Sequence, residues 1–431
     1  MRFCFTSTGL LDYNTYGRPK GTNRIRPIPD ILYYGGQNIA SIFLDFAKKS
    51  LREGGCAMDA VGIVAEYNPF HGGHAYQIAQ TRRLLGECAV VCVMSGHFVQ
   101  RGECAVLDKW GRARRALEGG ADLVLELPTP YAMSSAETFA RGAVSILTAA
   151  GIDALSFGCE TPDPAALQAL ADALNSPAFD AAVSPLMARG LSYPAARQRA
   201  AAALLGRSAA ALLALPNNNL AVEYLRALPR GVTPLPIFRA GAHDAPLPDP
   251  QDPSAASLRA LLRAGERADL YLPAPWQGQV YDLRYLERAI LSRLRTMRLE
   301  ELETFHDAGD GLAQRLWRAA QTAASLAGLW DAAKTKRLTH ARLRRVTLRA
   351  ALAVPPPASP ACLRVLAMTQ PGAAHLSALK AACPLPIVTK PARHKDLLAA
   401  EAALTDQFSL CAGLPVPCGE EFRHSPVLIG S

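Results

Sequence analysis

The sequence lacks a run of apolar residues long enough to cross a membrane. Half of its 431 residues are hydrophobic, yet the closest approach to such a run, residues 200–215, is interrupted by Arg207. This stretch predicts an alanine-rich helix, because a membrane-spanning helix needs about 20 uninterrupted apolar residues. The apolar stretch after Arg2 is interrupted by Asp12 and is too short for a secretory signal. These absences favour a cytoplasmic protein without membrane contact.

Cysteine pairs of the kind that bind zinc are also missing. The ten cysteines include no C-x-x-C pair and have no regular spacing, which argues against a zinc ribbon and a disulfide framework. We therefore expect reduced thiols, as in the cytosol. No cluster of carboxylates identifies a dedicated metal site, so we assign no metal ligands.

Acidic residues are fewer than basic residues. The chain has 37 Asp and Glu against 46 Lys and Arg, which gives a net charge of +9 and a pI near 9.1. This excess favours a polyanionic partner. A composition rich in arginine throughout gives the same bias, so the charge is informative only where it clusters.

The first 57 residues have no periodicity and do not resemble the rest of the chain. They contain Thr, Asn, Tyr, Gly and Arg in no repeating pattern, and Met58 stands three residues before the first apolar run. We interpret residues 1–57 as an upstream extension from a mis-assigned start codon or as a dispensable tail. A disordered arm that belongs to the protein is the alternative.

From Met58 onward the chain alternates strand and helix patterns, which predicts an α/β fold with a parallel sheet and right-handed crossovers. Each strand is followed by a loop rich in polar residues, and the carboxyl ends of parallel strands share one edge. We therefore expect these loops to form a single site. The expected strands are residues 61–64, 89–94, 123–127, 154–157 and 234–239, and the loops are residues 67–74, 95–103, 128–131 and 158–160.

The rest of the chain is expected to be mainly helical. Residues 161–230 predict helices interrupted at residues 216–219, and the serine at Ser254 predicts the N-cap of a helix to residue 262. Residues 280–354 also predict helices, and two strands follow a proline-rich linker at 355–360. We expect an α/β domain in residues 58–270 and a mainly helical region in residues 271–431.

The most informative motif is VGIVAEYNPFHGGHAY at residues 61–76, a short apolar run, a turn and two histidines at a helix start. Pro69 ends the extended segment, and the paired glycines let the backbone approach a phosphate. The helix offers free N–H groups to that phosphate. Neutral imidazoles at His71 and His74 can donate hydrogen bonds to charge that develops at the α-phosphorus. The motif therefore predicts nucleotidyl transfer. A bare H-x-x-H also suits zinc binding or packing, but no third ligand lies nearby.

With these residues in view, the chain resembles the tRNA(Met) cytidine acetate ligases, bacterial members of the HIGH-type nucleotidyltransferase superfamily. The resemblance extends from Met58 to about Leu410. It depends on an ordered set of motifs, which is far more specific than the first motif alone. The motifs are EYNPFHGGH, SGHFVQRGE, DKWGRARRALEGGADLVLELP, FGCE, PNNNLAVEYL, SAASLR and KTKRLTHARLRR.

The resemblance implies a Rossmann-like HIGH-superfamily domain followed by a mainly helical C-terminal domain. It implies that ATP activates acetate to acetyl-adenylate, and that the acetyl group passes to the wobble cytidine of elongator tRNA(Met). His71, His74, Ser254 and Arg259 would act on the phosphates. The ATP-binding residues would be Ile63, Val64, Ala65, Glu66, Tyr67, Asn68, Pro69, Phe70, His71, Gly72, Gly73, His74, Ala75, Tyr76, Gly158, Asn217 and Arg239. Mg²⁺ is expected with ATP. No protein partner is implied.

The chain departs from the family pattern at three places. Ala256 stands where the family has a threonine, so one hydroxyl contact to phosphate is absent. His97 replaces the more usual asparagine and Cys104 the more usual proline. Asn217 and Arg239 also have structural alternatives, a helix cap and an ion pair. The departures put substrate affinity in doubt more than the type of reaction.

A cluster of positive charge supports the nucleic-acid partner independently. Residues 334–349 contain seven Lys and Arg and no carboxylate. On a helix, Arg342, Arg345 and Arg349 share one face, while Leu343 and Val346 lie on another. A solvated face usually includes Glu or Asp for ion pairs, so this pattern favours contacts to a phosphate backbone. A surface helix of an arginine-rich protein is the alternative. The expected tRNA-binding residues are Lys334, Lys336, Arg337, Arg342 and Arg345.

Two other functions are compatible with parts of the sequence. A small-molecule adenylyltransferase of the same fold would need little beyond the α/β domain, which the long basic C-terminal region disfavours. A catalytically silent, nucleotide-sensing RNA-binding protein is disfavoured because His71, His74 and Arg259 are intact.

Overall fold

The computed structural model describes residues 59–430, apart from 162, 239–253, 267, 269–270 and 273–277, together with a short strand pair, β1 (Tyr33–Tyr34) and β2 (Gln37–Asn38). The predictions for Arg239 and for the N-terminal extension beyond this strand pair lie outside the described residues. Within the described part of the chain, no helix is both long enough and apolar enough to span a bilayer.

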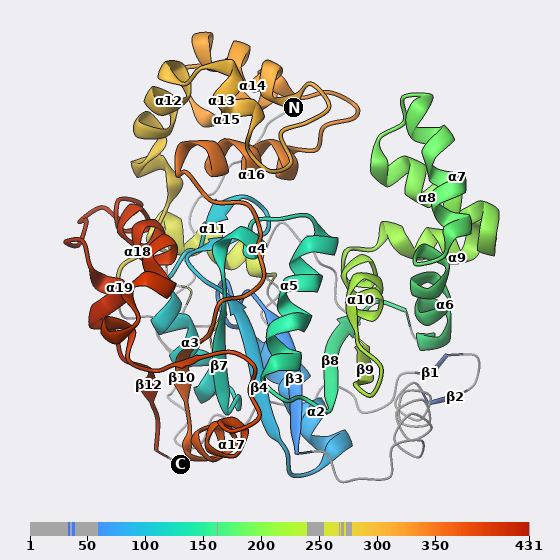
Figure 1. The fold of residues 1–431 in the computed structure, drawn as a ribbon, viewed down its shortest axis with the longest axis vertical. Helices are drawn as coiled ribbons and strands as arrows, with labels where there is room; N and C mark the ends of the chain where they lie inside the picture. The colour runs from blue at the N-terminus through green and yellow to red at the C-terminus, as the bar shows by residue number, and fades with distance from the viewer. Residues whose placement is uncertain are drawn as a thin grey trace, which may run out of the picture.

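A mostly parallel sheet forms the centre of the molecule (Figure 1). Its strands are in the order β11-β10-β7-β4-β3-β8-β9, and β12 pairs with β10. The run from β7 to β9 is parallel, as the alternating pattern predicts, and its strands are apolar because both faces are covered. These strands are β3 (Ala60–Ala65), β4 (Ala89–Ser95), β7 (Leu123–Leu127), β8 (Ala154–Cys159) and β9 (Thr233–Phe238).

The chain order places a switch point beside the first core strand. From β3 the chain proceeds to β4 and β7 on one side, and then crosses to β8 on the other side of β3. Where the order of parallel strands reverses, the loops at their carboxyl ends diverge and leave a crevice that binds ligands. The loops after β3 and β8 are therefore the expected walls of a site.

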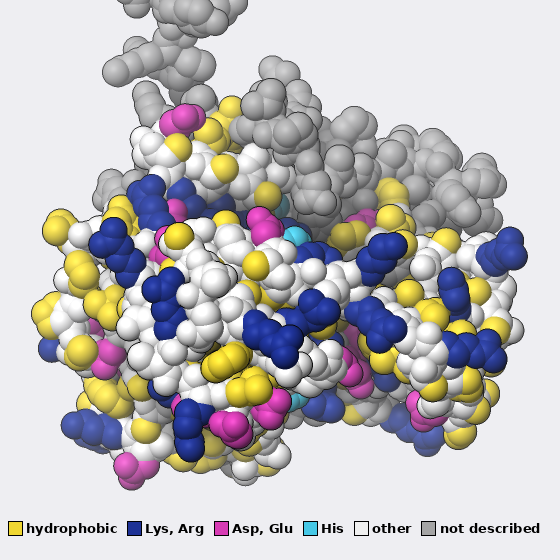
Figure 2. Space-filling view, turned by 90° about the horizontal axis from the view of Figure 1, so that it is seen from above, with side chains coloured by type: hydrophobic (Ala, Val, Ile, Leu, Met, Phe, Trp, Pro, Cys, Tyr) yellow, Lys and Arg dark blue, Asp and Glu magenta, His cyan; other side chains and the backbone are white. Residues whose placement is uncertain are grey.

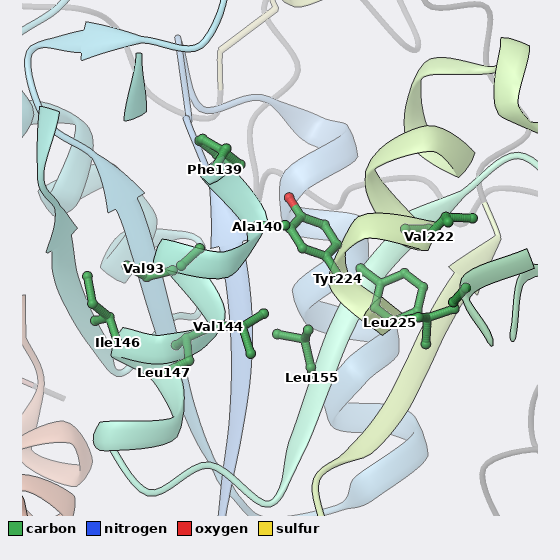
Figure 3. Close-up of a cluster of buried hydrophobic side chains, with 14 of the residues drawn as sticks. Val93, Phe139, Ala140, Val144, Ile146, Leu147, Leu155, Val222, Tyr224 and Leu225 are labelled. Carbon is green, nitrogen blue, oxygen red and sulfur yellow. The ribbon is translucent and has the colours of Figure 1, made fainter. Parts of the chain in front are cut away.

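Helices cover both faces of the sheet. One face packs on α2 (Gly72–Leu85) and α3 (Lys109–Glu118), and the other on α5 (Ala136–Ala149) and α10 (Pro216–Ala227). Figure 3 shows side chains of α5 and α10, including Val144 and Tyr224, gathered over Leu155 of β8. Beyond α10 the covering continues in a helical arm, which lies at the right of Figure 1. The arm consists of α6 (Pro164–Leu174), α7 (Pro177–Ala188), α8 (Tyr193–Leu205) and α9 (Arg207–Ala211).

The break between the helices falls at Leu215 instead of at the predicted residues 216–219. The chain is extended at Leu215, and Pro216 begins α10, so the three asparagines form the first turn of a helix. Proline is favourable there because the first helical N–H has no partner within the helix. The asparagines are therefore placed at a helix N-terminus instead of in a loop.

The C-terminal region builds a second core and then returns to the sheet. Its helices pack around Leu294, Leu316 and Leu343, and the core also includes Phe98 from the loop after β4 and Phe408 from α18. These helices are α12 (Glu287–Thr296), α13 (Leu299–Glu303), α14 (Leu312–Thr322), α15 (Leu326–Ala333), α16 (His340–Ala351) and α18 (Lys395–Ser409). In contrast, α17 (Gln370–Leu379) packs Leu376 into the core of the sheet, and α19 (Glu420–Arg423) lies near the C-terminus.

The two strands expected after the proline-rich linker do form, and they extend the central sheet. They are β10 (Leu363–Met368) and the short β11 (Ile387–Val388), and β12 (Val427–Leu428) follows near the C-terminus. In contrast to the five core strands, β10 runs antiparallel to β7. The sheet is therefore mixed at this edge.

Candidate active site

The loop between β3 and α2 adopts a compact shape that sequence spacing did not reveal. Tyr67 is buried and has a positive φ of 46°, and the peptide bond between Asn68 and Pro69 is cis. Phe70 is fully buried, and its ring lies so close to Gly119 that any Cβ there would be 2.1 Å from Cζ. These contacts turn the chain sharply from the strand end to the helix start.

His71 and His74 form a reciprocal cap at the N-terminus of α2. His71 Nδ1 accepts a hydrogen bond from the Gly73 amide at 3.1 Å, and His74 Nδ1 accepts one from the His71 amide at 3.2 Å. A ring nitrogen that accepts cannot carry a proton, so in each neutral ring the proton is on Nε2. The two rings lie 3.9 Å apart, centre to centre. The cap thus converts both side chains into Nε2–H donors at the positive end of a helix.

Space for a phosphate is present next to this cap. Gly72 is exposed, and a methyl group on its Cα would meet no atom within 4 Å. The Gly73 amide is already bound to His71 Nδ1, so an anion at this helix start would approach the open side of Gly72. Of the other predicted contacts, Ile63 and Ala65 point their side chains into the core, so these two residues can reach a nucleotide only through backbone atoms.

A buried arginine that sequence reasoning missed holds the loop between β3 and α2 in place; we call residues 66–71 the nucleotide loop. Arg112 of α3 has no exposed surface and donates to the carbonyl oxygens of Glu66 at 2.6 Å and Leu107 at 3.1 Å. It also donates to the carbonyl oxygens of Ser95 and Gly96. One guanidinium thus joins the loops after β3 and β4. The available signal was an arginine on an otherwise apolar face of the predicted helix.

Glu66 is a buried carboxyl group at the start of the loop. Its side chain accepts a hydrogen bond from the Gln100 amide at 2.8 Å. Burial raises the pKa of Glu66 above its usual range, although this hydrogen bond and the charges of Arg259, Arg101 and Arg112 oppose the shift. The carboxyl group therefore anchors the second loop to the first.

The structure brings the predicted Arg259 to the nucleotide loop. Ser254 caps α11 (Ala255–Ala264), with its Oγ 3.2 Å from the Ser257 amide, as predicted. One turn on, Arg259 Nη1 donates to the carbonyl oxygen of Asn68 at 2.8 Å. The hydroxyl of Ser254 is occupied within the cap, 3.0 Å from Ser257 Oγ. A phosphate contact at this helix start would therefore come from backbone amides and Arg259.

The loop after β8 is joined to the start of α10. The Glu160 carboxylate accepts hydrogen bonds from the Asn217 amide and side chain at 3.1 and 3.0 Å. Asn218 is fully buried, and its Oδ1 accepts from the Glu160 amide at 2.8 Å. Asn217 therefore lies beside the loop after β8, and the carboxylate of Glu160, not an asparagine side chain, accepts the first amides of α10. Sequence reasoning missed Asn218 as the residue that fixes this loop.

A second buried group of charges joins the start of α3, which follows the loop after β4, to β7, β10 and α19. Lys109 Nζ lies 2.6 Å from Glu126 Oε1 and 2.5 Å from Glu421 Oε2. Arg364 Nε lies 3.1 Å from Glu421 Oε1. All four side chains are nearly inaccessible, so two cations and two carboxylates balance one another in the core. The partners are as many as 312 residues apart, which explains why sequence patterns gave no sign of them.

The basic helix α16 differs from the prediction. Leu343 and Val346 are buried, as expected, but Arg349 is also fully buried and donates to the Met133 carbonyl oxygen at 3.0 Å. Arg342 forms ion pairs with Asp307 and with Asp310, each at 2.9 Å. Arg345 also pairs with Asp307, at 3.3 Å. The inference that no carboxylate neutralises this helix was therefore wrong, because the carboxylates come from an earlier loop.

The loop before α16 retains its charge. Lys334, Lys336 and Arg337 are exposed, and no carboxylate of the described residues forms an ion pair with them. No group of three or more His, Cys, Asp or Glu side chains suited to a metal ion occurs in the part of the chain that the structure describes.

Comparison with known proteins agrees with this geometry. Residues 58–415 match the HIGH nucleotidyl transferase family. The tRNA(Met) cytidine acetate ligase of Syntrophotalea carbinolica is 39% identical over 78% of this chain and 86% of its own length. The ligase of the same name from Listeria monocytogenes serotype 4b is 36% identical over 86% of this chain and 100% of its own length.

A solved structure extends the likeness to the fold. The crystal structure of Thermotoga maritima TmcAL bound with alpha-thio ATP is 28% identical and superposes with a TM-score of 0.78. The match covers 87% of this chain and 100% of that chain. With the sheet order and the capped histidine pair, these likenesses show that the chain belongs to the tRNA(Met) cytidine acetate ligase family of HIGH nucleotidyl transferases.

Proposed function

We propose that this protein is an ATP-dependent ligase. It activates acetate to acetyl-adenylate and transfers the acetyl group to N4 of the wobble cytidine of elongator tRNA(Met), forming N4-acetylcytidine. The observation that carries the proposal is the reciprocal cap of His71 and His74, which leaves the proton of each neutral imidazole on Nε2 at a helix N-terminus. The names of the relatives supply the acceptor.

In the first step, a carboxylate oxygen of acetate attacks the α-phosphorus of ATP. The bond from phosphorus to the bridging oxygen of pyrophosphate breaks, and pyrophosphate leaves. Negative charge builds on the α-phosphate oxygens in the transition state, where the Nε2–H groups of His71 and His74 stabilise it. Arg259 and the first amides of α11 neutralise the pyrophosphate. Mg²⁺ would enter with ATP and would supply further positive charge to its phosphates, and we assign no residue of this chain to hold it.

In the second step, the N4 amine of cytidine attacks the acetyl carbonyl carbon. AMP leaves with the electron pair of the acyl–phosphate bond, and the amine loses one proton. ATP lies along residues 63–76 and reaches Gly158, near the carboxyl end of β8, and Asn217, in the first turn of α10. Arg239 would complete this set.

We assign tRNA binding to Lys334, Lys336, Arg337, Arg342 and Arg345. The first three support the assignment best, because they are exposed and unneutralised among the described residues. Arg342 and Arg345 would contact phosphate only by sharing or exchanging their aspartate partners. We place the protein in the cytoplasm, where its tRNA substrate is found.

Acetate-dependent exchange of pyrophosphate into ATP tests the proposal. We expect exchange with acetate and without tRNA, and the transfer product only when elongator tRNA(Met) is added. A His74→Ala variant serves as the control for contaminating activity. Absence of exchange with acetate would overturn the ligase assignment. Exchange with a phosphorylated or pyridine substrate instead would indicate a small-molecule adenylyltransferase.

A further inference from the structure

We propose that the turn between α7 and α8, residues 189–193, binds the anticodon loop of the tRNA. In this proposal Tyr193 is a stacking platform for an unpaired base, and Arg189 and Arg337 contact the phosphates on either side. The proposal depends on the proposed function, since it takes tRNA as the partner.

Tyr193 is an unusually exposed aromatic side chain. Only two aromatic residues, Tyr193 and Tyr285, are among the exposed large hydrophobic side chains of the described residues, and Tyr193 is 42% exposed. It is the first residue of α8, so its ring stands at the helix end. Burial of the inner part of the ring raises the pKa of its phenol above the usual value, with a smaller opposing effect of Arg197. The ring therefore stays uncharged at neutral pH, as stacking beside phosphates requires.

The turn meets the basic loop of the C-terminal region. Gly190 has a positive φ of 87°, and a Cβ on it would lie 2.0 Å from Arg337 Nη2. The guanidinium of Arg337 is thus laid against the backbone of the turn, next to the exposed Arg189. No carboxylate of the described chain pairs with either arginine. Two exposed arginines are therefore present at a turn that leads directly into the exposed Tyr193.

This contact joins the two helical regions that flank the upper edge of the sheet, the arm of α6–α9 and the group α12–α16 (Figure 1). Lys and Arg side chains are spread over the face seen from above in Figure 2, across both regions. The carboxyl ends of the parallel strands form this edge of the sheet, and the nucleotide loop follows one of these strands, β3. A wobble base delivered to the nucleotide would have its neighbouring bases near this turn.

The chemistry of the turn suits an RNA loop. Proteins that recognise unpaired nucleotides stack the bases on aromatic rings and hold the phosphates with basic side chains. The basic segment 334–349 contains no aromatic residue, so a stacking residue must come from elsewhere in the fold, and Tyr193 supplies it. The side chain of Ser192 makes no cap hydrogen bond to α8, so the amides of Tyr193 and Ala195, on either side of Pro194, are the donors that this helix start offers to a phosphate.

Matched variants of the full-length protein test the inference. Affinity for elongator tRNA(Met) is measured by fluorescence anisotropy, and acetate-dependent pyrophosphate exchange is measured on the same preparations. We expect Tyr193→Ala to weaken tRNA binding roughly tenfold, in the range of one lost base stack. Tyr193→Phe should bind like the wild type, because it keeps the ring. Tyr285→Ala removes the other exposed aromatic and should change the affinity less than twofold.

A second variant addresses the phosphate contacts. Arg189→Ala combined with Arg337→Ala should lower the slope of log affinity against log salt by about 1.4, for two contacts to a single strand. Exchange activity should be unchanged in the Tyr193 and Tyr285 variants and in Arg189→Ala alone, which also shows that each of these is folded. If Tyr193→Ala and the double variant bind tRNA as Tyr285→Ala does, the inference is overturned while the ligase assignment stands. Loss of exchange in the wild type would overturn the ligase assignment itself.

Discussion

The buried charge group around Lys109 gives a sharp prediction about stability. Lys109 Nζ contacts Glu126 at 2.6 Å and Glu421 at 2.5 Å. Burial alone would lower the pKa of Lys109, but the charges of these two carboxylates outweigh it and raise the pKa, so the amine is charged. Lys109→Met keeps an unbranched side chain, one atom shorter, and removes the charge. Two buried carboxylates then remain with Arg364 as their cation.

We expect Lys109→Met to lower the free energy of unfolding by about 3–5 kcal/mol, the usual cost of removing one partner from a buried ion pair. This loss is large against a typical domain stability of roughly 5–15 kcal/mol. Burial already raises the pKa of Glu126, and loss of Lys109 would raise it further. A carboxyl group with a raised pKa in the folded state costs stability as the pH rises. The deficit should therefore be greater at pH 8 than at pH 5.5.

Urea unfolding followed by tryptophan fluorescence measures this effect in the wild type, Lys109→Met, Glu421→Gln and the double variant. Glu421→Gln should destabilise the wild type but restore stability to Lys109→Met, because it removes a carboxylate left in excess. The exposed pair of Arg293 and Glu301 is the matched control, and Arg293→Met should cost less than about 1 kcal/mol. Additive losses in the double variant would refute a shared charge group.

Three further predictions concern the histidine pair, two glycines near it, and Glu401, a carboxyl group of α18. His74→Ala should lower pyrophosphate exchange by roughly 10²–10³-fold, as for one lost oxyanion donor, with tRNA affinity unchanged; wild-type exchange would end the proposed role. Gly119→Ala should cost about 1–3 kcal/mol because its Cβ would lie 2.1 Å from Phe70. Gly72→Ala has open space and should keep its stability while losing ATP affinity, and equal melting temperatures for the two glycine variants without ATP would contradict this contrast. Burial and the charge of Glu126 raise the pKa of Glu401 from 4.5 to about 7, so wild-type stability should fall as the pH rises through this interval. Glu401→Gln should flatten the urea midpoint between pH 5 and 8, and a profile parallel to the wild type would disprove the assignment.

Local sequence patterns were sufficient for the elements that carry the site. The apolar run before residue 66 predicted β3, the glycines and histidines predicted the start of α2, and Ser254 predicted the cap of α11. Periodicity, turn residues and caps are short-range properties, because they depend on backbone groups within about one helical turn. Since the strands are parallel, these local elements also predicted that their loops would share an edge.

Pairing between distant residues was decided only by the tertiary structure. The sequence of α16 gave no sign that Asp307 would neutralise Arg342 and Arg345, and it suggested a solvated face where Arg349 is buried. The same holds for the antiparallel β10 at the sheet edge.

The sequence by itself therefore indicated the kind of reaction, because the two histidines and two glycines of residues 71–74 form a motif within four residues. The tertiary structure alone decided which arginines are neutralised by carboxylates. An arginine binds phosphate or a carboxylate with similar chemistry, so its role depends on which partner the fold brings within reach. For Arg342 that partner is 35 residues earlier in the sequence, and for Lys109 it is 312 residues later.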